Sequence, residues 1–374
     1  MFRKSIYLPG CAKLIDNYIW VSLLELGCLV KIEVNTGHLS FVGRFPVEDA
    51  SYQLYFQINE YENKLIFCPW NTNCISVYDM KMHDFRIVPM KKYNYFGAGR
   101  FLSAVHENEC LYFISENAKE IVEFDMRQEM IKDVYPLSEK EFEDDFFGFV
   151  MPLRTQKDIW KISEKRGRTW KFNIISKTYE KRELINEDMT IYTGCSSKDD
   201  IWTLTENSVL YQFTSDGEYF KEYDLSEILK CKLKKQGEER EFFSSIYLNS
   251  NLFFIWYGKK CIIRIPVKDS TVQIKEYQIT YYDRASFSFG DKLIVMEDNR
   301  TAVIEGEDKR EVIIENSYSF MKDIVKAMDN KLMEKNSSCM ELESFISFLD
   351  YHTESCAGGN RENTSGNRIY RMMI

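Results

Sequence analysis

The sequence predicts an all-β fold, a seven-bladed β-propeller of four-stranded antiparallel blades with a C-terminal α-helical appendage. Three observations support the propeller: an apolar run that recurs along the chain, a second run at a nearly constant offset from it, and a high aromatic content. The 374 residues include 23 Tyr, 26 Phe and 6 Trp, and such side chains pack well on pleated sheets. Because 44% of the residues are hydrophobic, the chain can bury a large core.

The first apolar run starts at seven positions that lie 41 to 51 residues apart: Ile19, Leu65, Leu111, Ile159, Ile201, Leu252 and Leu293. A second run follows eight to ten residues after each start. The fourth residue of this second run is always large and apolar: Ile32, Tyr78, Phe124, Phe172, Phe213, Ile265 and Ile304. A polar residue compatible with a turn generally comes next, as in Asp79, Asp125 and Asn173.

Each unit also has a mixed run upstream, such as LYFQI, and a more polar run downstream, such as FRIVPM. Four strands at a period near 45 residues are typical of a propeller. A helical solenoid would need apolar residues three and four apart over ten or more positions, whereas these runs are about six residues long and rich in β-branched and aromatic residues. We therefore expect a propeller over residues 1–315, with blades that start near residues 5, 50, 97, 145, 189, 241 and 284.

The pattern changes after residue 315. Residues 316–352 carry apolar residues at helical spacing and predict a helical appendage: Phe320, Ile324, Val325, Met328 and Leu332. The appendage either packs against the propeller or docks a partner. Residues 353–374 have the composition of a flexible tail, although the last seven, RIYRMMI, are apolar enough to add to a sheet edge or fill a pocket.

Charge and cysteine content limit the classes of partner. The net charge of −9 and the lack of an extended basic patch argue against nucleic-acid binding.

The N-terminal residues lack the apolar stretch of a signal peptide, and no run of about 18 apolar residues predicts a membrane span. The ten cysteines are scattered without a CxxC pair, which favours reduced thiols and excludes a paired zinc site. We therefore expect a cytoplasmic protein.

The sequence contains no recognisable catalytic motif. GxSxG, HExxH, P-loop and glycine-rich dinucleotide patterns are all missing. The four histidines, His38, His83, His106 and His352, are not paired in sequence. An acidic cluster at residues 139–145 indicates either a solvated loop or a weak calcium site, but it lacks EF-hand spacing. No cofactor and no metal are expected.

Loops at one axial mouth supply the candidate binding residues. They combine aromatic, amide and cationic side chains: Trp70, Asn71, Asn73, Arg166, Arg168, Trp256, Tyr257 and Lys259. Such groups can stack on a sugar and hydrogen-bond its hydroxyls, or anchor a protein partner, and they are also common where blades meet. The sequence thus favours a non-enzymatic binding or scaffold propeller for a protein or a glycan. The alternative is a carbohydrate-active or lyase-type enzyme that uses carboxylates at the axial mouth.

Two blades resemble those of known families. Residues 199–225, DDIWTLTENSVLYQFTSDGEYFKEYDL, resemble a blade of the streptogramin-lyase and NHL-type propellers. Residues 65–80, LIFCPWNTNCISVYDM, are similar to kelch-like and YVTN-like blades. Over about residues 5–315 the chain resembles seven-bladed propeller proteins of low-GC Gram-positive bacteria. The resemblance implies the fold, but it assigns no catalytic residue, because the chain has no match for the histidine-containing, magnesium-assisted site of streptogramin lyases.

Overall fold

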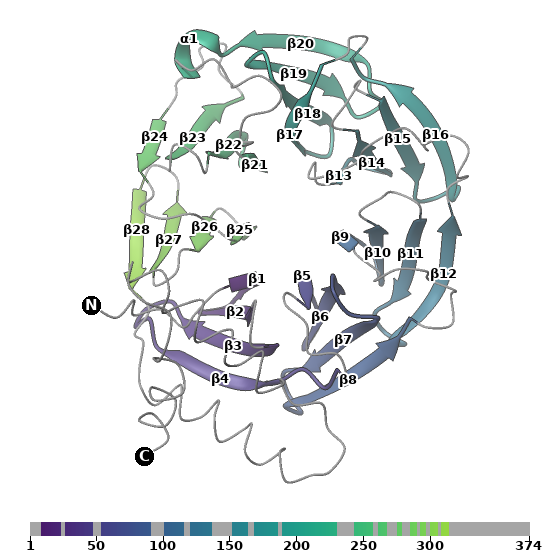
Figure 1. The fold of residues 1–374 in the computed structure, drawn as a ribbon, viewed down its shortest axis with the longest axis vertical. Helices are drawn as coiled ribbons and strands as arrows, with labels where there is room; N and C mark the ends of the chain where they lie inside the picture. The colour runs from purple at the N-terminus through teal and green to yellow at the C-terminus, as the bar shows by residue number, and fades with distance from the viewer. Residues whose placement is uncertain are drawn as a thin grey trace, which may run out of the picture.

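The computed structural model describes a radial all-β fold (Figure 1). It describes residues 9–23, 27–47, 54–90, 101–115, 120–136, 152–163, 168–185, 189–229, 243–256, 261–267, 275–278, 285–289, 292–296, 300–305 and 308–313. Within these ranges, 28 strands form seven four-stranded antiparallel sheets around a central axis. The predicted all-β propeller of four-stranded antiparallel blades is therefore confirmed.

The first four blades span residues 9 to 183. Their strands are β1 (Pro9–Ile15), β2 (Tyr18–Leu23), β3 (Cys28–Glu33), β4 (Leu39–Arg44), β5 (Tyr55–Tyr61), β6 (Lys64–Pro69), β7 (Cys74–Asp79), β8 (Asp84–Pro89), β9 (Phe101–Glu107), β10 (Cys110–Ser115), β11 (Glu120–Asp125), β12 (Met130–Pro136), β13 (Leu153–Arg154), β14 (Asp158–Ile162), β15 (Arg168–Asn173) and β16 (Thr178–Glu183).

The remaining three blades span residues 191 to 313. Their strands are β17 (Ile191–Ser196), β18 (Asp200–Thr205), β19 (Val209–Thr214), β20 (Tyr219–Asp224), β21 (Phe243–Leu248), β22 (Asn251–Trp256), β23 (Cys261–Pro266), β24 (Lys275–Gln278), β25 (Ala285–Phe289), β26 (Lys292–Met296), β27 (Arg300–Glu305) and β28 (Asp308–Ile313). Among the described residues the only helix is α1 (Ser226–Leu229). The predicted appendage at 316–352 and tail at 353–374 lie outside the described residues.

Every blade is built from one continuous stretch of chain. Its first strand lies nearest the axis and its fourth lies outermost (Figure 1). The ring closes where β1 of the first blade meets β25 of the last. Among the described strands, neither of these two sheets borrows one from the other end of the chain, so closure between them depends on packing between blades.

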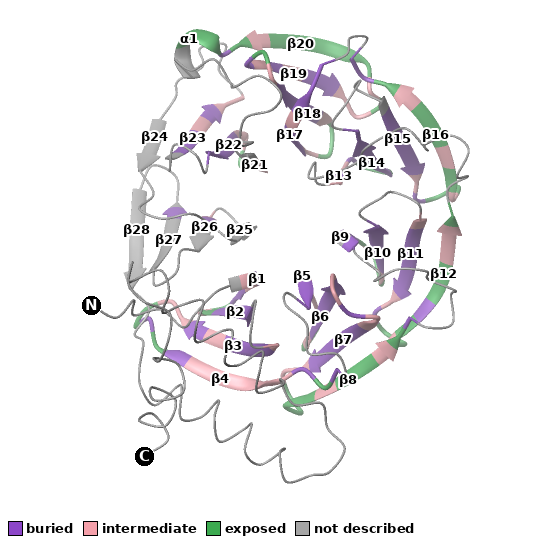
Figure 2. Ribbon diagram, in the orientation of Figure 1, coloured by how far each residue is buried: buried purple, intermediate pink, exposed green. Residues whose placement is uncertain are grey.

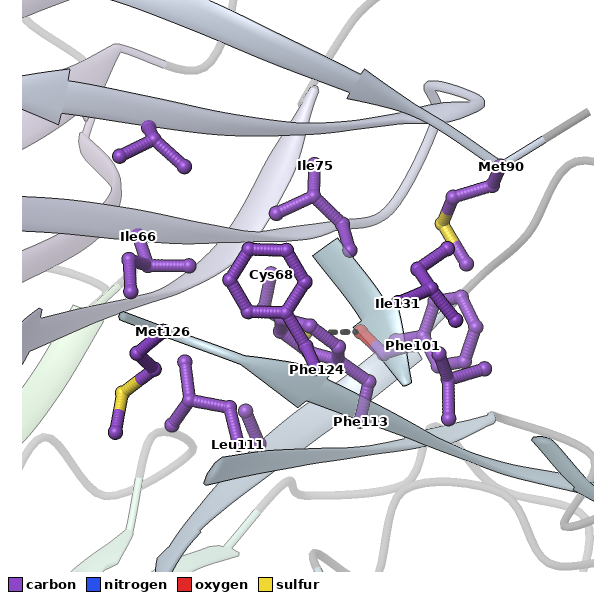
Figure 3. Close-up of a cluster of buried hydrophobic side chains, with 13 residues drawn as sticks. Ile66, Cys68, Ile75, Met90, Phe101, Leu111, Phe113, Phe124, Met126 and Ile131 are labelled. Atoms are coloured by element: carbon purple, nitrogen blue, oxygen red, sulfur yellow. Dashed lines mark hydrogen bonds between the residues drawn. The ribbon is translucent and has the colours of Figure 1, made fainter. Parts of the chain in front are cut away.

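The core consists of apolar layers between neighbouring blades. Figure 3 shows one such layer, in which Ile66 and Ile75 of the second blade face Phe113 and other side chains of the third. The seven large apolar residues at the fourth position of the second run, from Ile32 to Ile304, are all buried, with at most 3% of their surface exposed. Central strands are apolar on both faces because a blade covers each face.

The outermost strands meet solvent, as Figure 2 shows for β8, β16 and β20. Their mixed charges discourage edge-to-edge association with other sheets. The downstream run of each unit is more polar than the two apolar runs because it forms the outermost strand of the blade.

The turn between the third and fourth strands has the same construction in several blades. The carboxylate Oδ1 of Asp79 accepts backbone N–H groups from Lys81 and Met82, both at 2.9 Å. Asp125 and Asn173 cap their own turns in the same way. These are the polar residues that follow the second apolar run, and the cap explains why that position is polar.

Each of these turns also contains one residue in the left-handed backbone region: Gly37, His83, Glu129, Lys177 and Gly217. Glycine adopts this conformation most easily. Glu129 and Lys177 use it to aim a side chain at the preceding blade, since Glu129 pairs with Lys64 at 2.6 Å and Lys177 with Glu123 at 2.8 Å, whereas His83 contacts Tyr78 of its own blade.

Six cysteines lie in the described residues, and none of these forms a disulfide: Cys11, Cys28, Cys68, Cys74, Cys110 and Cys195. Burial raises the pKa of the Cys28 thiol to about 12 and that of Cys195 to about 12. The buried thiols of Cys28 and Cys195 are therefore packing groups at neutral pH. A search of the described residues finds no helix long and apolar enough to cross a membrane.

Candidate binding site

The innermost strands are tied to one another by side chains that bond to backbone groups of a neighbouring blade. The amide of Gln57 on β5 accepts from the N–H of Ala104 at 2.7 Å and donates to its carbonyl at 3.3 Å. The hydroxyl of Ser196 on β17 makes the same pair of contacts with the backbone of Arg154 on β13, at 2.8 and 2.9 Å. These contacts satisfy strand edges that would otherwise lack partners near the axis.

Two further contacts link the innermost strands of neighbouring blades. The guanidinium of Arg154 pairs with Glu107 on β9 at 2.5 Å, and the hydroxyls of Thr193 and Ser245 lie 2.7 Å apart. Glu107 is thus a carboxylate near the axis, but its partner is a cation of the next blade. The geometry gives it a role in holding the ring together.

Replacing Gln57 by leucine is expected to lower the free energy of unfolding by about 1–3 kcal/mol, because the backbone N–H and C=O of Ala104 would lose their partners. Urea denaturation measures this change. Gln156, whose side chain is exposed, provides the matched control, and its replacement by leucine should change the stability by less than about 0.5 kcal/mol. Equal effects of the two substitutions would show that the amide bridge contributes nothing.

Residues 70–73 join β6 to β7 and contain three of the predicted binding residues. The backbone N–H of Trp70 donates to the carbonyl of Leu54 at 2.8 Å, and that of Asn71 donates to the same carbonyl at 3.3 Å. The carbonyl of Asn73 accepts from Met90 at 2.8 Å. The half-buried Trp70 ring lies 4.9 Å from the ring of Phe56, at an interplanar angle of 33°. We call residues 70–73 with Phe56 the Trp70 loop.

The other predicted binding residues have different surroundings. Trp256 ends β22 and is only 3% exposed, because it packs in the apolar layer between the fifth and sixth blades. Its aromatic character therefore reflects a blade contact. Arg168 opens β15, and Arg166, Tyr257 and Lys259 lie outside the described residues.

Three histidines are described, and each has a local contact. The backbone N–H of His38 donates to the hydroxyl of Thr36 at 3.1 Å. A ring nitrogen of His83 lies 3.2 Å from the hydroxyl of Tyr78, and one of His106 lies 2.7 Å from the carbonyl of Asn108. Within the described ranges, no three His, Cys, Asp or Glu residues are close enough to hold a metal ion.

The sequence analysis missed a set of polar residues inside the blades. In five of the seven second apolar runs the third residue is polar: Lys31, Glu123, Lys171, Gln212 and Arg264. In three of these blades the partner is the first residue of the second strand: Lys171 lies 3.5 Å from Asp158, Gln212 3.1 Å from Asp200, and Arg264 2.8 Å from Asn251. A polar residue at the third position of an otherwise apolar run is the signal that predicts such a pair.

Glu123 has the densest set of partners. It is 1% exposed, and it accepts from Lys132 at 3.1 Å, from Lys177 at 2.8 Å and from the hydroxyl of Tyr135 at 2.5 Å. Burial by itself raises the pKa of Glu123, but the hydrogen bonds from these three donors outweigh it and lower the pKa to about 2. Because Lys177 belongs to the fourth blade and Glu123 to the third, this cluster joins two blades.

A scan against protein-family models finds no match, and a search of curated proteins finds none either. Solved structures do share the fold. Virginiamycin B lyase from Staphylococcus aureus superposes with a TM-score of 0.58 at 13% identity, over 79% of this chain and 94% of that one. A streptogramin B lyase structure gives a TM-score of 0.52 at 18% identity, over 73% and 86% of the two chains.

Hydrazine synthase of Kuenenia stuttgartiensis is equally similar in shape. It gives a TM-score of 0.59 at 10% identity, over 80% of this chain and 96% of that one. Proteins with different activities thus share this architecture, and at these identities the likeness shows the β-propeller fold alone. The predicted resemblance to streptogramin-lyase propellers is confirmed at the level of fold, while the similarity to kelch-like blades stays a prediction.

Proposed function

We propose that this chain is a non-enzymatic binding propeller that recognises a protein or a glycan through the axial face that carries the Trp70 loop. The observation that supports this is the fixed geometry of the loop. Two backbone hydrogen bonds to Leu54 and the contact between the Trp70 and Phe56 rings hold an aromatic side chain beside Asn71 and Asn73. A preorganised loop loses little conformational entropy on binding.

The chemistry of the loop suits both kinds of ligand. An indole ring contributes a large, rigid contact surface, and neighbouring amides both donate and accept hydrogen bonds. The enzymatic alternative requires carboxylates free to transfer protons or stabilise charge at the axial mouth. The pairing of Glu107 with Arg154 favours binding over that alternative, because the carboxylate already has a cationic partner.

Trp70→Ala is expected to weaken ligand binding at least tenfold, because it removes the rigid aromatic surface. A glycan microarray tests the glycan class. A photo-crosslinking residue at position 71, followed by titration with the purified captured protein, tests the protein class. Ile175→Ala is the matched control, since Ile175 is 79% exposed in a turn at the opposite end of the blades, and it should bind as the unaltered chain does.

Trp70→Phe separates folding from recognition, because it keeps a ring against Phe56. Unchanged thermal unfolding of both Trp70 variants, with affinity reduced in the alanine variant and partly retained in the phenylalanine variant, supports the proposal. Equal binding by Trp70→Ala and Ile175→Ala contradicts it. Chemical turnover of a bound glycan that is abolished by Glu107→Gln would instead establish the enzymatic alternative.

A further inference from the structure

The outer strand of the fifth blade, β20, has an unusual exposed edge. Among the described strands β20 has no neighbour on its outer side, and Figure 2 shows most of its length as exposed. Tyr219 is 59% and Phe220 is 63% exposed. Phe220 is the extra residue of a β-bulge against β19, and bulges of this kind re-aim side chains at strand edges.

The backbone of β20 presents hydrogen-bonding groups to solvent. The N–H of Leu225 donates to the carbonyl of Ser208 at 2.9 Å, which makes these two residues a hydrogen-bonded pair. In an antiparallel ladder such pairs alternate with pairs whose backbone groups point away from each other. The N–H and C=O groups of Glu222 and Asp224 therefore face outward, whereas those of Tyr223 face β19. Another extended strand can pair with such an edge.

Charge distinguishes this edge from the other outer strands. β8, β12 and β16 each carry equal numbers of acidic and basic residues, and β8 and β12 end in proline. β20 itself carries one cation, Lys221, and two carboxylates, Glu222 and Asp224, and the residues that flank it add three more carboxylates without a further cation: Asp216, Glu218 and Glu227. An aromatic and acidic edge is complementary to a strand that is apolar and basic.

The same chain contains a segment with these properties. Residues 368–374, RIYRMMI, include two arginines, no acidic residue and five apolar residues. We propose that this segment binds the outer edge of β20 as a fifth strand of the fifth blade. Its arginines would meet the carboxylates of residues 218–227, and its apolar side chains would cover Tyr219 and Phe220.

The tether between the propeller and this segment is long enough. Fifty-four residues separate Ile313, the end of β28, from Arg368. With residues 316–352 in the predicted helical appendage, the other 17 residues span about 23 Å as a coil, and the appendage adds its own length. A folded body of some 310 residues has a radius of gyration of about 20 Å. Tethering also gives an effective concentration on the order of millimolar, which favours even weak pairing.

Amide hydrogen exchange on the full chain, resolved to single residues, tests the proposal. The amides of Glu222 and Asp224 are expected to exchange at least tenfold more slowly in the unaltered chain than in the Arg368→Glu/Arg371→Glu variant. Tyr223 is an internal reference, because its amide faces β19 in both proteins. Arg361→Glu, a charge reversal outside the segment, should leave all three exchange rates unchanged.

A charge exchange separates a specific contact from a general loss of stability. Adding Glu218→Lys and Glu222→Lys to the double arginine variant is expected to restore the slow exchange of Asp224. Equal exchange of Glu222 and Asp224 in the unaltered and double-arginine proteins would overturn the proposal. Protection that rises with protein concentration would overturn it as well, because it would assign the edge to a second copy of the chain.

Discussion

Replacing Glu123 by alanine is expected to lower the free energy of unfolding by about 2–3 kcal/mol, less than for a fully buried ion pair, because the Lys177 side chain is 30% exposed. The carboxylate is 1% exposed and accepts hydrogen bonds from Lys177, Lys132 and Tyr135. Without it, the ammonium of Lys177 would remain between two blades with no anion. Urea denaturation at pH 7 measures the loss.

Glu180→Ala is the matched control. Glu180 is 49% exposed and pairs with Arg182 at 2.8 Å, so solvent screens the pair and its loss should cost at most about 1 kcal/mol. If Glu123→Ala and Glu180→Ala destabilise the protein equally, the third and fourth blades are held together by apolar packing and not by the Glu123 cluster.

The same carboxylate predicts a dependence of stability on pH. The pKa of Glu123 is lowered to about 2 in the folded protein, whereas a glutamate in an unfolded chain has a pKa of about 4.3. A lowered folded-state pKa stabilises the protein above the unfolded pKa, and this stabilisation is lost as the pH falls toward 2. The gap in unfolding free energy between the unaltered chain and Glu123→Ala should therefore narrow between pH 5 and pH 3.

Gly217→Ala is expected to lower the free energy of unfolding by about 2–4 kcal/mol. Gly217 has a φ of +88°, and a Cβ placed there would lie 2.8 Å from the indole of Trp160 in the preceding blade. An alanine at positive φ costs about 1 kcal/mol or more, and forcing a buried side chain to move adds about 1–3 kcal/mol. Thermal unfolding followed by circular dichroism measures the sum.

A double-mutant cycle separates these two costs. In a Trp160→Leu background the indole is gone, so Gly217→Ala should cost about 1–2 kcal/mol, the backbone term together with a small shift of Leu184, whose Cδ2 would lie 3.1 Å from the new Cβ. A cost that is the same in both backgrounds would show that the turn of the fifth blade does not press on Trp160.

The strand pattern was predictable because it depends on burial within each blade. A second or third strand lies between two neighbouring blades, so its residues are apolar without a gap, and Leu65, Leu111 and Phe124 could be located from their spacing alone. The cap at Asp79 or Asp125 was also predictable, since a turn needs a polar residue directly after the strand.

The contacts between blades were not predictable in the same way. Glu123 and Lys177 are 54 positions apart, and Trp160 and Gly217 are 57 apart; they meet only because the ring places consecutive blades face to face. The same geometry explains why Trp256, predicted to bind a ligand, is buried instead. For the Trp70 loop the sequence indicated the aromatic and amide residues, but it could not show that Phe56 supports the indole.

Closure of the ring between β1 and β25 has a consequence for how the protein is made. No strand of the last blade is needed to complete the sheet of the first, so the first blade can form as soon as it leaves the ribosome. Its free face, however, meets β25 only after about 240 further residues have been added. At roughly 5–20 residues per second, that face remains uncovered for about 12 to 50 seconds. During this interval the nascent chain is most in need of chaperone protection.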